Sequence, residues 1–160
     1  MKVTMDEVRA ALSPEEPDYG RAAQLGPDAL PYLEAIMRAS DPLMAAKAVY
    51  LAGLIPTQRS ISILAEAAQH PQPTVRVAAA ATMSNLTPPD ASQLLLRMMS
   101  DSDLGVVKVA LQSVPQGASP ALRDQLHRMA VGSGDSPLGA ILQQALARAE
   151  AAISPSVDLD

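Results

Sequence analysis

Apolar and polar residues follow a helical period in most segments of the chain. Residues 58–69 and 90–99 carry apolar side chains spaced three or four residues apart, and polar side chains fill the positions between them. This spacing places the apolar residues on one face of an amphipathic helix. The stripe of the first segment consists of Ile61, Leu64, Ala65 and Ala68, and that of the second of Leu94, Leu95 and Met98. The segments that follow each of these are apolar nearly all round, which predicts a half-exposed outer layer of helices and a more deeply packed second layer.

Two kinds of marker recur along the chain with the same spacing. Prolines that suit the first turn of a helix are separated by 29, 32 and 32 residues, and basic residues within the apolar segments are separated by 29 and 32. A pair of helices repeated about every 30 residues is the unit of an α-solenoid. The prolines are Pro27, Pro56, Pro88 and Pro120, and the basic residues are Lys47, Arg76 and Lys108.

We therefore expect an all-α protein, an α-solenoid of about four helical hairpins with a short N-terminal helical cap. The cap spans residues 4–25, and the hairpins span residues 28–54, 58–86, 90–114 and 120–153. Residues 1–153 are expected to form one domain, followed by a disordered acidic tail at residues 154–160.

Composition agrees with helices packed on helices. Aromatic residues make up 2% of the chain, with three Tyr and no Phe or Trp, so the core must consist of aliphatic residues and Ala. Ala favours helix and lets two helices approach closely. The net charge of −5 is unfavourable for nucleic acid, whose binding needs a basic surface. The segment Met1–Glu7 carries two acids where a signal peptide needs an apolar run, and no apolar stretch is long enough to span a bilayer, so we expect a soluble, cytoplasmic protein that does not associate with membranes.

At this point the residues resemble the HEAT-repeat family, including its shorter HEAT-like repeats. The second helix of that repeat typically follows an Asp-containing turn and reads Val-Arg-x-x-Ala. Residues His70–Ala79 read His-Pro-Gln-Pro-Thr-Val-Arg-Val-Ala-Ala, and the segments beginning at Asp41 and Asp103 are looser copies. The fourth hairpin has Gln143 near the basic position, so it is expected to be an atypical terminal cap. The resemblance implies a structural ladder, in which the acid of one turn bonds the base of its own or the next repeat, formed by Asp41, Lys47, Arg76, Asp103 and Lys108.

Nothing in the sequence marks an active site, a metal site or a cofactor site. His70 and His127 lie in different repeats, without a carboxylate at a metal-binding spacing, and the chain has no Cys. Residues 132–135 form a Gly-containing turn that lacks the Lys of a phosphate loop. We therefore expect no catalytic residues and a protein that is not an enzyme. The case for an enzyme rests only on the analogy with those HEAT-like proteins that are enzymes.

In the family's architecture the second helices line a concave surface, and the residues after each Lys or Arg are our candidates for that surface. An exposed apolar strip of this kind marks an interface. Two functions remain open: an interaction module that binds a protein or peptide partner, and a structural subunit that covers the strip by forming a homo-oligomer. A one-residue error in register would instead make these side chains core. The candidates are Ala48, Leu51, Ile55, Val77, Ala80, Ser84, Val109 and Gln112.

Overall fold

The computed structural model describes residues 2–39 and 41–151, and within them every regular element is a helix. The predicted tail at residues 154–160 lies outside the described residues. The α-helices are α1 (Met5–Leu12), α2 (Tyr19–Ala22), α3 (Leu30–Ala39), α4 (Pro42–Ala52), α5 (Gln58–Ala67), α6 (Pro73–Ala81), α7 (Pro88–Met98), α8 (Leu104–Gln112), α9 (Pro120–Ser133) and α10 (Gly139–Glu150). Three short 3-10 helices, η1 (Ala23–Leu25), η2 (Pro27–Ala29) and η3 (Met83–Asn85), lie between them.

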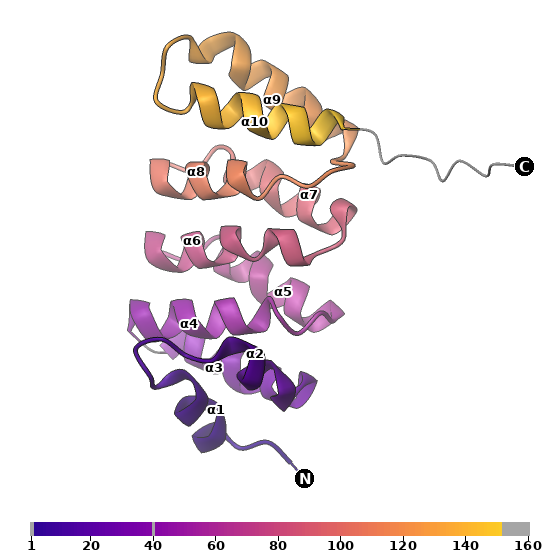
Figure 1. Ribbon diagram of the computed structural model, residues 1–160. Coiled ribbons are helices and arrows are strands. Elements are labelled where there is room, and N and C mark those ends of the chain that lie inside the picture. Colours follow the sequence, from indigo (N-terminus) through magenta and orange to yellow (C-terminus); the bar gives the residue numbers. More distant parts are fainter. Residues whose placement is uncertain (1, 40, 152–160) are drawn as a thin grey trace, which may run out of the picture.

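The helices form a stack of hairpins in two layers (Figure 1). The second helices α4, α6, α8 and α10 lie one above another, each packed against the next, while α3, α5 and α7 lie behind them. Each second helix also packs against the first helix of its own hairpin. Side chains such as Leu33, Ile36, Leu64, Leu95 and Leu111 are fully buried between the layers. The predicted all-α solenoid is therefore confirmed.

Helix starts are set by local sequence. Asp41 precedes α4 and accepts hydrogen bonds from the N–H groups of Leu43 and Met44, and Asp103 accepts one from the N–H of Val106 at the start of α8. These side chains satisfy backbone donors that have no partner within the helix. Prolines lie in the first turn of α4, α6, α7 and α9, where a missing N–H costs nothing. Of the four regularly spaced prolines, Pro88 and Pro120 begin α7 and α9 and Pro27 begins η2, whereas Pro56 lies before Thr57, the N-cap of α5.

The helix ends differ from the predicted ones by a few residues. The second helices end earlier than expected, at Ala52, Ala81 and Gln112, and the chain after α6 continues as the 3-10 helix η3. Apolar residues beyond each helix end, such as Ile55 and Met83, are still buried, which explains why hydrophobicity alone placed the ends too late.

The N-terminal helices α1 and α2 are joined to α4 by two contacts. The Lys47 ammonium donates hydrogen bonds to the carbonyl oxygens of Leu12 (3.3 Å) and Pro14 (2.7 Å). The rings of Tyr19 and Tyr50 meet edge to face, with centroids 4.6 Å apart. Burial, followed by the neighbouring Tyr50, raises the pKa of Tyr19. This N-terminal pair therefore covers part of the first repeat.

Close packing of the second helices depends on one glycine. Gly53 follows α4 and Thr82 follows α6, so both occupy the C-terminal ends of second helices in consecutive repeats. A Cβ at position 53 would lie 2.4 Å from Cβ and Cγ2 of Thr82. A side chain at this position would force the two helices apart.

Candidate partner-binding surface and its clefts

Half of the residues predicted to line the second-helix surface are core residues. Ala48, Leu51 and Ala80 are fully buried and Ile55 is 4% exposed, so their assignment to an exposed groove was wrong. On α4, Lys47 is half-buried and Tyr50 is exposed, and each lies one residue before a predicted position. A shift of one residue turns a helical side chain by about 100°, which moves it from the solvent side to the packed side.

The other four candidates lie at or near the surface. Val77 on α6 and Val109 on α8 are half-buried, whereas Ser84 and Gln112 are exposed. Ser84 and Gln112 are therefore as accessible as expected, although Ser84 belongs to η3 rather than to a second helix, and Val77 and Val109 are accessible only in part.

The surface that the second helices leave uncovered combines large apolar residues with single cations. Leu43 is 63% exposed, Leu104 is 69% exposed and Tyr50 is 37% exposed. Helices α4, α6 and α8 carry one basic residue each and no acidic residue, although the chain as a whole has a net charge of −5. We define the second-helix face as the exposed or half-buried residues Leu43, Lys47, Tyr50, Thr74, Val77, Ala81, Leu104, Lys108 and Gln112.

Sequence reasoning missed Leu43, Tyr50 and Leu104, although a signal for them was present. Leu43 and Leu104 each precede a Lys by four residues, which places leucine and lysine on the same side of the helix. Because a Lys side chain is rarely buried, Lys47 and Lys108 themselves mark the uncovered side. The residues four before each Lys were therefore better candidates than those immediately following it, and so was Tyr50, three residues after Lys47.

The predicted ladder of acids and bases exists at one position only, and with a different acid. Arg76 pairs with Asp101 of the next repeat through Nε (2.8 Å) and Nη2 (3.1 Å), not with Asp103. It also donates to the carbonyl oxygens of His70 and Pro71 in its own repeat. Asp41 and Asp103 serve as helix caps instead, and no ion pair joins them to Lys47 or Lys108 in the part of the chain that the structure describes.

The Arg76–Asp101 pair is largely removed from water. Its two side chains are only 13% and 10% exposed. Burial alone would raise the pKa of the Asp101 carboxyl, but the hydrogen bond from Arg76, that from the N–H of Asp103 and the guanidinium charge outweigh it, so the pKa is lowered. The pair ties the turn of the second hairpin to the turn of the third.

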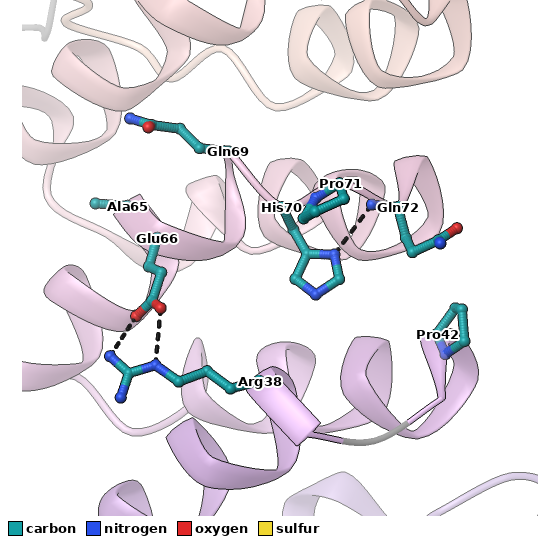
Figure 2. A pocket seen from close by; sticks show the side chains of 8 residues that line it. All are labelled: Arg38, Pro42, Ala65, Glu66, Gln69, His70, Pro71 and Gln72. Carbon is teal, nitrogen blue, oxygen red and sulfur yellow. Dashed lines mark hydrogen bonds and ion pairs between the residues drawn. The ribbon is translucent and has the colours of Figure 1, made fainter.

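A cleft of about 770 Å³ opens one repeat earlier, between the turns of the first and second hairpins (Figure 2). Arg38 is held there by two hydrogen bonds to Glu66 (2.8 and 2.9 Å) and one to Glu34, and the Nδ1 atom of His70 accepts from the N–H of Gln72. The hydrogen bond from Arg38 lowers the pKa of Glu66. The lining of this turn cleft consists of Arg38, Pro42, Ala65, Glu66, Gln69, His70, Pro71 and Gln72.

The turn cleft lies where the repeat signature changes. The second hairpin has His70 where the resemblance expects an acidic turn residue, so Lys47 of the first hairpin has no counterpart of Asp101 to bind. Lys47 points instead toward Leu12 and Pro14. The buried pair that joins hairpins two and three is therefore missing between hairpins one and two, which are joined instead by the pairs of Arg38 with Glu66 and Arg59 with Glu34.

A second opening, of about 350 Å³, lies between α8 and the loop that joins α9 to α10. Its surface is mostly carbon, and the Lys108 side chain is exposed at its edge. The lining of this α8 cleft consists of Leu104, Gly105, Lys108, Ser136, Pro137 and Leu138.

Neither cleft assembles an evident catalytic group. The turn cleft holds one His and one Glu, and the Glu is already bound by Arg38. Among the described residues, no group of three or more His, Asp or Glu side chains is placed to hold a metal ion. The expectation that the protein is not an enzyme stays a prediction. Within residues 2–39 and 41–151, no helix is long and apolar enough to cross a membrane.

Comparison with known proteins agrees with the repeat architecture. Residues 27–115 match the family of HEAT repeats, so the chain belongs to the HEAT-repeat family. Among solved structures, the chain is similar to one from the complex of CpcE and CpcF of phycocyanin lyase from Nostoc sp. PCC7120. The two are 22% identical with a TM-score of 0.66, over 88% of this chain and 96% of that chain, which establishes a shared fold. No curated protein gives a significant match.

Proposed function

We propose that this chain is a non-catalytic, cytoplasmic interaction module that binds a protein or peptide partner through the second-helix face. The observation that carries the proposal is the exposure of Leu43 and Tyr50 on α4 and of Leu104 on α8, two helices of the same layer. Large apolar side chains gathered on one face lose contact with water when a partner covers them, and this favours association.

The placement of the aromatic residues supports the same surface. None of the three tyrosines is part of the buried core, and two of them meet at the edge of the second-helix face. Tyr is enriched at protein interfaces because its ring adds apolar area while its hydroxyl bonds to polar groups. The core consists of aliphatic residues, and Tyr50 is 37% exposed, so its ring is accessible to a partner.

The similar solved chain comes from a complex of two different proteins, which supports a protein partner for a helical stack of this shape. That complex belongs to a lyase, so a second form of the proposal is that this chain is an accessory subunit of an enzyme. Both forms require a heterologous partner. Self-association into a homo-oligomer is the alternative, because it would cover the same apolar residues.

The test combines affinity capture with measurement of mass in solution. Full-length protein, the double variant Leu43→Ser/Tyr50→Ser and the control Val131→Ser serve as baits in native lysate. Val131 is 90% exposed on α9, which contributes no residue to the second-helix face, so its replacement removes an exposed apolar side chain without changing that face.

We expect a protein that the wild type and Val131→Ser retain and the double variant loses, together with a monomer mass at all concentrations. A mass that doubles with concentration and falls back in the double variant would establish self-association instead. Equal capture by all three baits would refute the role of the face.

A further inference from the structure

The α8 cleft has the chemistry of a specific subsite rather than of a general apolar surface. Leu104 and Lys108 are separated by one helical turn, so the leucine side chain and the ammonium group lie next to each other on the same side of α8. Leu138 and Pro137 form the opposite wall. An apolar wall beside a single cation accommodates one apolar side chain and one carboxylate.

Lys108 differs from the other cations of the second helices. Lys47 is bonded to Leu12 and Pro14, Arg76 is bonded to Asp101, and Arg148 on α10 donates to the carbonyl oxygens of Leu111 (2.7 Å) and Val114 (3.1 Å). Lys108 is exposed and makes no hydrogen bond or ion pair within residues 2–39 and 41–151.

The carboxylates of the neighbouring turn make no ion pair with this cation. Asp101 is bound to Arg76, and Asp103 accepts from the N–H of Val106 at the start of α8. Asp135, in the loop before α10, is exposed but does not line the cleft. A carboxylate brought by another molecule therefore has a cation available beside an apolar wall.

We propose that the α8 cleft receives a segment of the partner protein in which an apolar side chain lies next to an Asp or Glu. The apolar side chain packs against Leu104 and Leu138, and the carboxylate pairs with Lys108. This inference rests on the proposed function and adds the chemistry of the partner at one end of the second-helix face. Charge complementarity selects the acid, because α4, α6 and α8 carry cations and no carboxylate.

A random peptide display library selected on the immobilised full-length protein tests the proposal. We expect the retained peptides to carry an apolar residue within one helical turn of an acid. The strongest of them, labelled and measured by fluorescence anisotropy, should bind Lys108→Glu about tenfold more weakly, since reversal replaces an exposed ion pair with repulsion. Leu104→Ser should weaken binding by about the same factor.

The matched control is Arg97→Glu, which changes the net charge by the same amount on an exposed position of α7. Its affinity for the selected peptide should equal that of the wild type. Selection repeated on Lys108→Glu should retrieve peptides in which Lys or Arg replaces the acid. Peptides that lack an acid, or that bind Lys108→Glu as well as wild type, or the absence of any enriched peptide, would overturn the proposal.

The chain's own C-terminal sequence, Asp158-Leu159-Asp160, has the same apolar and acidic character. If Leu159→Ser in the full chain binds the selected peptide at least tenfold more tightly than the wild type, the cleft is occupied by this segment and the partner proposal fails. A captured protein that depends on Leu43 and Tyr50 but is retained by Lys108→Glu would leave the proposed function standing and refute only the present inference.

Discussion

Replacing Gly53 with Ala tests the closest approach in the stack. The backbone at Gly53 is helical, with φ of −65° and ψ of −17°, so Ala is compatible with the local conformation and would favour helix over Gly. The obstacle is tertiary. The new Cβ would lie 2.4 Å from both Cβ and Cγ2 of Thr82, whose hydroxyl is itself bonded to the carbonyl oxygen of Ala79.

The expected cost follows from this geometry. Carbon atoms at optimal separation are about 3.5–4 Å apart, so α4 and α6 must separate by roughly an ångström. Thr82 Cβ is attached directly to the backbone and cannot rotate away. Overpacking of this kind costs about 1–3 kcal/mol, from which the helical gain of up to about 1 kcal/mol must be subtracted. We expect a net loss of roughly 1–2 kcal/mol in the free energy of unfolding, or several degrees in the melting temperature.

Thermal and urea denaturation followed by circular dichroism measure the change, and the chain supplies its own control. Gly132 lies within α9, and a Cβ there would meet nothing within 4 Å. Gly132→Ala should therefore stabilise the protein by about 0.5–1 kcal/mol, opposite in sign to Gly53→Ala. If both substitutions shift the stability in the same direction, the close approach of α4 and α6 does not exist and the reasoning fails.

Three further predictions concern other contacts. Asp101→Asn should lower the free energy of unfolding by about 3 kcal/mol at neutral pH, because it leaves the Arg76 guanidinium unpaired. Since the pKa of Asp101 is lowered in the folded protein, the stabilisation by its carboxylate is present above the ordinary pKa of 3.8 and is lost as the pH falls through the lowered pKa. The stability curves of variant and wild type should therefore converge in acid. Leu51→Ala should lower the free energy of unfolding, measured by urea denaturation, by about 2–5 kcal/mol, since Leu51 is fully buried. A loss of less than about 0.5 kcal/mol would show that Leu51 is a surface residue. Lys47→Met removes the bonds to Leu12 and Pro14, so amide hydrogen exchange should accelerate in α1 and not in α8; uniform acceleration would argue against a local role.

The charge pairs show where the sequence motif stops being informative. Two aspartates lie two residues apart in the same turn, and either could have bonded Arg76. The structure selects Asp101 because Asp103 is at the helix N-terminus, where its carboxylate faces the N–H of Val106. The turn conformation decides between them, and a motif that lists residue types does not contain that information.

What the sequence determined by itself was the repeat. Evenly spaced prolines, capping residues and basic residues predict paired helices and their order, because helix starts and stops depend on neighbours within a few residues. What only the tertiary structure decided was which side of each second helix is buried. Helix α4 is apolar nearly all round, so its periodicity does not distinguish the side that packs on α3 and α6 from the side carrying Leu43 and Tyr50. The clefts likewise depend on contacts between repeats, which the sequence does not specify. Once the hairpins have stacked, Lys47 bonds to Pro14, Arg76 bonds to Asp101 and Lys108 lines the α8 cleft.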